Sequence, residues 1–277
     1  MKTITIAAPV RNREWILPQY LLKIFEINYP KSLIDLHFVV NDSLDRTFEL
    51  LTEFKKGNKG LYNNIRIDVI NNGTPEDERE FTVRNKHIYK HLSNLKNYIM
   101  TKTRTDKLIF IDTDILVESD VITKLLKHGK KIISALIYNG YLTNKEKPYM
   151  YPNIMQLDDK GQYRHITNYH VKTAPTLLCS KLQRVDLTGA VILLDKSVYK
   201  SIKYGFHPQG EDAYFCKMAQ DNGFELFCDL FAYSQHIMSE QQLREFMNEA
   251  KNDTLLSRPE LGIFKATSTT DPFSIRT

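Results

Sequence analysis

Short runs of apolar and β-branched residues recur along the chain, separated by polar stretches. The runs, each long enough for a buried strand, cover residues 3–9, 34–40, 65–70, 107–111, 131–138 and 185–195. Between them the pattern becomes helical. The clearest helical segment spans residues 82–101, where apolar residues recur at spacings of four, three and four (Ile88, Leu92, Leu95 and Ile99).

Strands that alternate with helices predict an α/β domain with a mostly parallel central sheet and helices on both faces. Such sheets bind ligands beyond the carboxyl ends of their strands. The segment "KLIFIDTD" (107–114) places Asp112 and Asp114 at such an end, directly after a buried run. We therefore expect a site there.

Residues 139–182 interrupt the alternation with a long polar stretch rich in tyrosine: Tyr141, Tyr149, Tyr151, Tyr163 and Tyr169. A stretch of this length is typical of a lid or binding surface, and tyrosines suit a polar, ring-shaped ligand. The alternative is an excursion that only packs on the domain. A last helix follows over "SEQQLREFMNEAKN", and the end at residue 277 reads as loosely held, so we expect a main domain at 1–238 and a helical tail at 239–277.

The composition is that of a folded protein, with 42% hydrophobic and 26% charged residues among 277. Pro9 and Arg11 interrupt the apolar start, and no apolar run is long enough to span a membrane, so we expect a soluble, cytoplasmic protein. The three cysteines form no C-x-x-C pair. The glycine-rich motifs of dinucleotide-binding and P-loop proteins are absent.

The net charge of +5 comes from one segment, because residues 84–107 hold seven Lys or Arg and one Asp. A basic face favours an anionic ligand or surface, although many solvated helix faces are basic as well. Both readings stay open on the residues alone.

Asp112 and Asp114 are separated by one residue, and carboxylates so close need a positive partner. Mg²⁺ and Mn²⁺ bind through one or two carboxylates and complete their shell with water and phosphate oxygens. The pair therefore predicts a divalent cation, Mn²⁺ or Mg²⁺. Two solvated aspartates in a turn are the alternative.

Further motifs stand in a recognisable order: "PVRNRE" (9–14), "VVNDSLDRT" (39–47), Lys96-Asn97 fifteen residues before Asp112, and "GEDAYFCK" (210–217). Over residues 3–238 the chain resembles GT-A fold glycosyltransferases, and most of all family 2. That family has P-V-Y-N-E, V-D-D-G-S-x-D-x-T, A-R-N, D-x-D and a late acidic motif in this order. Here Lys96 replaces the Arg, Asn41 replaces the first Asp, and the glycine of D-G-S is missing.

The resemblance implies a metal-dependent enzyme that moves a sugar from a nucleotide-sugar donor, with a UDP-sugar favoured, to an acceptor hydroxyl or other nucleophile. It implies Asp112, Asp114 and His236 as metal ligands, Asp212 as the base of an inverting reaction and Glu211 as the residue that orients the acceptor. We also expect the Tyr-rich stretch, because of its length and its tyrosines, to lie on the acceptor side. The implied donor-binding residues are Pro9, Arg11, Asn41, Asp42, Arg84, Lys96, Asn97, Asp112 and Thr113.

Three other functions stay open at this point: a sugar nucleotidyltransferase, a retaining glycosyltransferase and a non-catalytic polyanion-binding protein. The sequence does not distinguish among a protein, peptide, glycan or small-molecule acceptor. It gives no oligomeric state.

Overall fold

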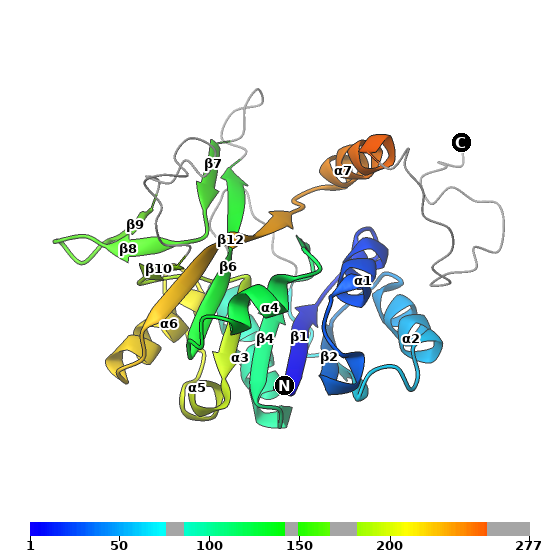
Figure 1. The fold of residues 1–277 in the computed structure, drawn as a ribbon, viewed down its shortest axis with the longest axis horizontal. Helices are drawn as coiled ribbons and strands as arrows, with labels where there is room; N and C mark the ends of the chain where they lie inside the picture. The colour runs from blue at the N-terminus through cyan, green and yellow to red at the C-terminus, as the bar shows by residue number, and fades with distance from the viewer. Residues whose placement is uncertain (76–85, 142–148, 167–181, 254–277) are drawn as a thin grey trace.

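The computed structural model describes residues 1–75, 86–141, 149–166 and 182–253. Its first half alternates strands and helices as expected (Figure 1). The elements are β1 (Ile4–Val10), α1 (Leu17–Glu26), β2 (Ile34–Asn41), α2 (Thr47–Gly57), β3 (Asn64–Ile70), α3 (Lys86–Lys102), β4 (Lys107–Ile111), β5 (Ile115–Val117) and α4 (Val121–Leu126).

The second half is richer in strands than the hydrophobic pattern predicts. Its elements are β6 (Ile132–Tyr141), β7 (Tyr149–Pro152), β8 (Met155–Leu157), β9 (Tyr163–His165), β10 (Leu182–Val185), β11 (Val191–Asp195), α5 (Lys196–Ser201), α6 (Glu211–Asp221), β12 (Leu226–His236) and α7 (Glu240–Asp253). The Tyr-rich stretch thus contains β7, β8 and β9, while residues 142–148 and 167–181 of it lie outside the described residues.

The main sheet has the order β10-β12-β6-β11-β4-β1-β2-β3. The strands β4, β1, β2 and β3 are parallel, but β11 runs antiparallel to both of its neighbours and β10 antiparallel to β12. The predicted mostly parallel sheet is therefore only partly right, and the sheet is mixed. The predicted strand at 185–195 is divided into β10 and β11, because the chain turns between them at Gly189 and Ala190.

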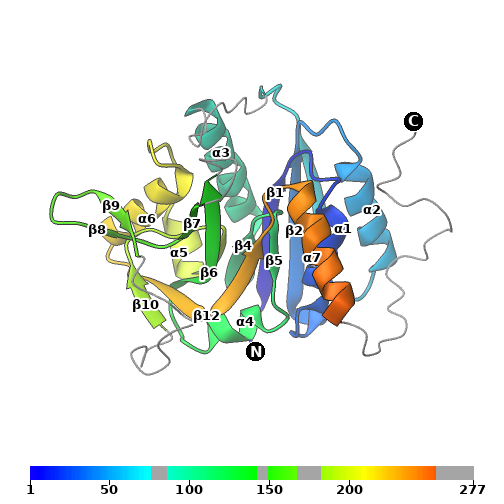
Figure 2. The same ribbon diagram turned by 90° about the horizontal axis from the view of Figure 1, so that it is seen from above.

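Helices cover both faces of the sheet, as predicted (Figures 1 and 2). Alternate residues of β4 enter different cores, with Ile109 and Ile111 on one side and Leu108 and Phe110 on the other. The first core takes apolar residues from α1, α2, α4 and α7, and the second takes them from α3, α5 and α6. Period-two alternation into two cores is what a sheet covered on both faces requires.

The last helix, α7, packs on the first core near α1 (Figure 2). Leu243 is buried there, and the partly buried Phe246 and Met247 contact the same cluster. The boundary predicted at residue 238 stays a prediction, but burial of this kind favours a helix that folds together with the domain.

We expect Leu243→Ala to lower the free energy of unfolding by about 2–5 kcal/mol, because it opens a cavity in the shared core. Denaturation in urea, followed by circular dichroism, should show a single transition at a lower midpoint. Arg244→Ala, on the exposed side of the helix, should change the free energy by less than about 0.5 kcal/mol. A Leu243→Ala protein as stable as wild type would show that α7 is an independent appendage.

Candidate active site

The edge at the carboxyl ends of β1, β2 and β4 has an unusual backbone. Among the described residues, the non-glycine residues with positive φ are Asn12 (48°), Asp42 (45°) and Ala190 (65°). Asn12 and Asp42 follow β1 and β2, and the Ala190 carbonyl accepts the Asp112 N–H at 2.9 Å. Such conformations cost about 1–3 kcal/mol each and cluster at functional sites. The strain therefore points to this edge.

Asp114 has a cationic partner from the loop after β1. Arg13 Nη2 donates to Asp114 Oδ2 at 3.0 Å, and Arg13 Nε donates to Thr113 Oγ1 at 3.2 Å. The Arg13 backbone N–H donates to Thr47 Oγ1 at 2.8 Å, which ties the loop to the start of α2. Arg13 was not among the site residues predicted from the sequence, although it is the second Arg of the motif "RNRE". The predicted Arg11 instead donates to the carbonyls of Thr74 and Pro75 at 2.7 and 3.1 Å.

Asp112 is less well compensated. Burial raises its pKa to about 7, and Asp114 and Asp212 add to this rise while Lys96 opposes it. The edge brings together the carboxylates of Asp112, Asp114, Glu211 and Asp212, with Arg13 and Lys96 as their cations. An additional cation beside Asp112 would relieve the remaining repulsion.

Lys96 bridges the two acids of the late motif. Its Nζ donates to Glu211 Oε1 at 2.9 Å and to Asp212 Oδ1 at 2.7 Å. The Lys96 side chain is 3% exposed, Glu211 8% and Asp212 26%, so Asp212 is the member that faces solvent. Burial alone would lower the pKa of Lys96, but the two carboxylates outweigh it and hold the pKa well above its usual range. Lys96 is therefore a permanent cation.

Aromatic side chains and an amide fix the surroundings of Lys96. Its Nζ lies 4.9 Å from the Tyr204 ring centroid, and that ring stacks on Phe215 at 4.4 Å. Asn97 holds the Tyr204 backbone with two hydrogen bonds of 2.9 Å, one donated by its Nδ2 and one accepted by its Oδ1. The predicted donor contacts of Lys96 and Asn97 stay predictions, since both side chains here bond groups within the protein.

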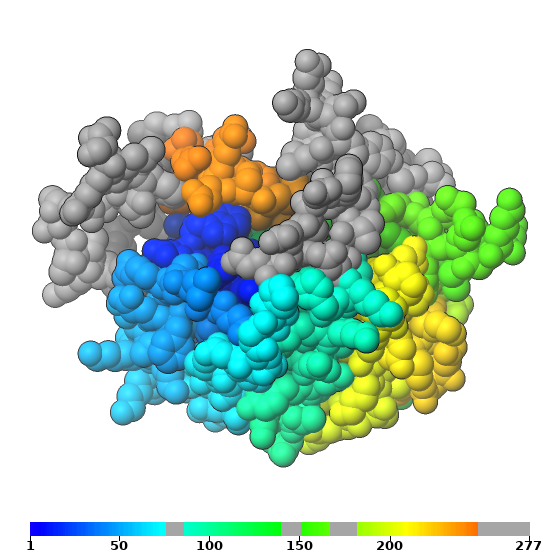
Figure 3. All heavy atoms as spheres, turned by 180° about the vertical axis from the view of Figure 1, so that it is seen from behind, coloured from blue at the N-terminus to red at the C-terminus, as the bar shows by residue number. Residues whose placement is uncertain are grey.

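Two glycines make room for the acidic motif at the start of α6. Gly210 has φ 112° and begins the helix that carries Glu211 and Asp212 in its first turn. An added Cβ at Gly189 would lie 2.1 Å from Asp212 Oδ2, so the carboxylate rests directly on this glycine. In Figure 3 the turquoise α3 and the yellow segment that leads into α6 lie side by side on one face. Their contact joins Lys96 to the acids.

His236 lies at the end of β12, where β5 pairs antiparallel to it and His236 stands opposite Ile115. Asn139 Oδ1 lies 2.8 Å from His236 Nδ1, and an amide oxygen only accepts, so Nδ1 carries the proton. The other nitrogen, Nε2, is 3.9 Å from Asp114 Oδ1. The fold thus brings His236 close to Asp114. Its predicted role as a metal ligand stays a prediction.

The remaining predicted residues lie along the same edge or outside the described residues. Asn41 Nδ2 is 3.1 Å from His91 Nε2. Asp42 accepts the N–H groups of Gly73 and Thr74 at 3.0 and 3.2 Å, which lower its pKa against the effect of burial. Pro9 is in β1, and Arg84 is outside the described residues.

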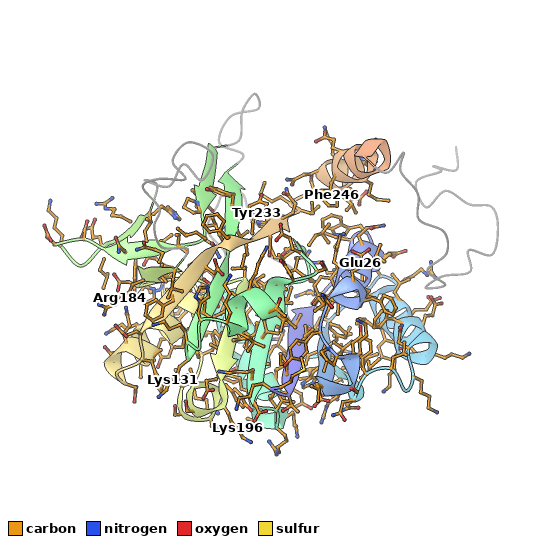
Figure 4. The ribbon with its side chains drawn as sticks, in the orientation of Figure 1. Glu26, Lys131, Arg184, Lys196, Tyr233 and Phe246 are labelled. Carbon is orange, nitrogen blue, oxygen red and sulfur yellow. The ribbon has the colours of Figure 1, made fainter. Side chains whose placement is uncertain are left out.

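The cations in the described part of the basic segment, residues 86–107, do not gather at this site. Lys107 pairs with Asp195 at 2.8 Å at the opposite edge of the sheet, where Lys131 and Lys196 also lie (Figure 4). Arg104 donates to the carbonyls of Thr101 and Thr103 near the end of α3, where cations favour the helix dipole. Of the described residues in the segment, Lys96 is the cation bonded to the acids of the site.

Within the described ranges, no three His, Cys, Asp or Glu side chains come close enough to hold a metal ion together. In the same part of the chain, none of the helices combines the length and apolar composition needed to cross a membrane. The predicted cytoplasmic location stays a prediction.

Sequence comparison places residues 1–167 in the family model described as Anp1. A glycosyltransferase 25 family member of Anopheles gambiae is 25% identical over 179 residues, which cover 61% of this chain and 29% of that protein. Procollagen galactosyltransferase 2 of Homo sapiens is 24% identical over 223 residues, covering 76% and 33%. The chain thus spans about a third or less of the length of these relatives.

Solved structures share the fold at low sequence identity. GalNAc-T7 with UDP, GalNAc and Mn²⁺ matches with a TM-score of 0.58 at 16% identity, covering 86% of this chain and 43% of that one. The mannosyltransferase PcManGT from Pyrobaculum calidifontis, with GDP-Man and Mn²⁺, matches with a TM-score of 0.52 at 12% identity, covering 93% and 66%. The predicted GT-A glycosyltransferase fold is confirmed, and the named relatives support the predicted enzyme class.

We expect Gly189→Ala to push the Asp212 carboxylate from its place and to lower the free energy of unfolding by about 1–3 kcal/mol through overpacking. Gly57→Ala is the matched control, because its added Cβ meets nothing within 4 Å and alanine favours a helix. Urea denaturation of both variants measures the effect. Equal stability of wild type and Gly189→Ala would contradict the close packing of Asp212 on Gly189.

Proposed function

Because the chain belongs to the Anp1 family and has the GT-A fold, we propose that it is a metal-dependent glycosyltransferase. It moves a sugar from a nucleotide-sugar donor to an acceptor hydroxyl, with inversion at the anomeric carbon. A UDP-sugar is the favoured donor, and the galactosyltransferase name of one relative makes a galactosyl donor the first to test.

The observation that carries this proposal is the meeting of two acidic motifs at one sheet edge. Asp112 and Asp114 leave β4 beside Glu211 and Asp212, which begin α6, and the charges of all four interact. A glycosyl transfer needs one negative group to recruit a cation for the leaving diphosphate and another to accept a proton. Paired motifs at one edge supply both.

The residues present fit a divalent cation shared with the donor. Asp112 and Asp114 offer hard oxygen ligands, and His236 Nε2 faces Asp114. Burial raises the pKa of Asp112 to about 7, and the neighbouring Asp114 and Asp212 carboxylates add to this rise. When bound, the cation would stabilise the charge that develops on the leaving diphosphate. An imidazole ligand favours Mn²⁺ over Mg²⁺. Since the side chains of the described residues do not close a site by themselves, donor oxygens and water would complete the shell.

The donor side lies along the ends of β1 and β2. We assign the nucleotide to the strained turns after these strands, with Pro9, Arg11, Asn41 and Asp42 as the contacts. Arg13 already holds Asp114 and Thr113, and its guanidinium is well placed for phosphate oxygens.

The acceptor side lies next to α6. A pocket of about 520 Å³ is lined by the β8–β9 turn and the segment before Gly210; its residues are Gly161, Gln162, Tyr163, Arg164, His207, Pro208 and Gln209. Gln209 stands three residues before Asp212, so chain geometry keeps their Cα atoms within about 11 Å. An acceptor bound in the pocket could therefore present a hydroxyl to Asp212.

Asp212 acts as the base in this proposal. As the acceptor oxygen bonds to the anomeric carbon, its proton passes to the Asp212 carboxylate, and the bond to the diphosphate breaks with its electron pair leaving on phosphate. Glu211 is nearly buried, which suits an orienting role better than proton transfer.

Incubation with nucleotide sugars and Mn²⁺ tests the activity as a whole. Release of nucleoside diphosphate supports a glycosyltransferase. Pyrophosphate formed from a nucleoside triphosphate and a sugar phosphate would instead indicate a nucleotidyltransferase, and the absence of both would favour a binding protein. A product with the donor's anomeric configuration would indicate retention.

We expect Asp112→Ala and Asp114→Ala each to lower Mn²⁺-dependent release of nucleoside diphosphate at least about 100-fold, because each removes a ligand or its partner. Asp195→Asn is the control, since this carboxylate pairs with Lys107 at the far edge of the sheet. It should leave the rate unchanged. Either alanine variant with wild-type rate and metal dependence would exclude the pair from metal binding.

We expect Asp212→Asn to lower kcat about 10²-fold or more while donor KM stays within a few-fold, because it removes only the proton acceptor. Steady-state kinetics on the active donor measures both constants. The base would have to be sought elsewhere if kcat stayed within a few-fold of wild type.

A further inference from the structure

Lys96 is a buried cation that has no role in the reaction as proposed above. It lies under Asp212, donates to both acids of the late motif, and is less exposed than either of them. The inference below rests on the proposed function, because it concerns the same base.

The two oxygens of Asp212 are held in different ways. Lys96 Nζ bonds Oδ1 at 2.7 Å, and Oδ2 lies over Gly189, where even a methyl group would come within 2.1 Å. A carboxylate bonded on one side and packed on the other has little freedom to rotate. Lys96 and Gly189 therefore both restrict its direction.

The charges of the cluster balance in a way that suits proton transfer. Lys96, Glu211 and Asp212 together carry −1 when both acids are ionised. When Asp212 accepts the acceptor's proton, Lys96 and Glu211 remain as a neutral, hydrogen-bonded pair. Without Glu211, the protonation of Asp212 would leave the buried ammonium without either of its hydrogen-bonded counter-charges, which proteins tolerate poorly.

We propose that Lys96 is the positioning residue of the base, holding the Asp212 carboxylate in place for proton transfer, and that Glu211 keeps Lys96 compensated while Asp212 is protonated. The side chains around Lys96 support this role. Tyr204 and Phe110 place ring faces within 4.9 and 5.9 Å of its Nζ, and Asn97 fixes Tyr204. Lys96 therefore acts through Asp212 and not on the donor phosphates.

Kinetics of Lys96→Met and Lys96→Arg test the proposal. Lys96→Met keeps most of the length of the side chain but not its charge, and should lower kcat about 10²-fold or more with donor KM within about threefold. Lys96→Arg should recover at least about tenfold of that loss. The assay is diphosphate release from the active UDP-sugar, with water as acceptor where no other is found.

The matched control is Lys107→Met, which removes a second largely buried lysine paired with one aspartate, 2.8 Å from Asp195. It should reduce stability without changing kcat. If Lys96→Met does not fold, Glu211→Gln tests the proposal in its place. This variant should lower kcat at least about tenfold at constant donor KM. Glu211→Gln with wild-type kcat would overturn the proposal, as would Lys96→Met that raises donor KM and keeps kcat, since Lys96 would then contact the donor.

Crystal structures of wild type and Lys96→Met give a readout that needs no activity. We expect the Asp212 carboxylate to leave its place over Gly189 in the variant, and an unmoved carboxylate would refute the positioning role. A wild-type protein that turns over no nucleotide sugar would refute the proposed function, while the crystallographic comparison would still decide whether Lys96 positions Asp212.

Discussion

The fold has to hold four carboxylates, those of Asp112, Asp114, Glu211 and Asp212, at one edge of the sheet. Like charges this close destabilise the fold unless cations or protons compensate them. Two cations do so in different ways: Arg13 meets Asp114 at the partly exposed side, and Lys96 meets Glu211 and Asp212 in the interior. Asp112 is left with the weakest compensation and a pKa near 7. The proposed divalent cation would relieve this imbalance.

The mixed sheet follows from the same requirement. A parallel β4–β1–β2–β3 half delivers strand ends with Asp112, Asn12 and Asp42 to one edge. The antiparallel β11 enters from that edge, and the Ala190 carbonyl at its start receives the Asp112 N–H. Gly189 beside it is where Asp212 rests. A parallel strand in this position would have its amino end at the far edge, and neither contact would form.

Site residues that belong to short contiguous motifs could be predicted from the sequence. Contacts between residues that lie far apart in the chain could not. Asp112 and Asp114 follow a buried run directly, and Glu211 and Asp212 follow a helix-starting glycine, so both motifs could be predicted. Lys96 stands 115 and 116 residues before the acids it bonds, and the motif pattern suggested phosphate contacts instead. Asn97 likewise serves the Tyr204 backbone 107 residues away. Such pairings arise from packing of α3 on α6, which hydrophobic spacing does not specify.

The position of His236 shows a second limit of prediction from the sequence pattern. Along β12, Asp229 pairs with Ala135 and Tyr233 with Leu136, so residues 230–232 are extra relative to β6. An odd number of extra residues exchanges the two faces of a strand for everything that follows. Asp229 holds this bulge, because its Oδ1 accepts the Phe231 N–H at 2.9 Å and its Oδ2 lies 2.8 Å from His128 Nε2. The bulge keeps His236 at the level of Asn139 and Asp114. A buried aspartate far from the edge therefore sets which face of the last strand the candidate metal ligand occupies.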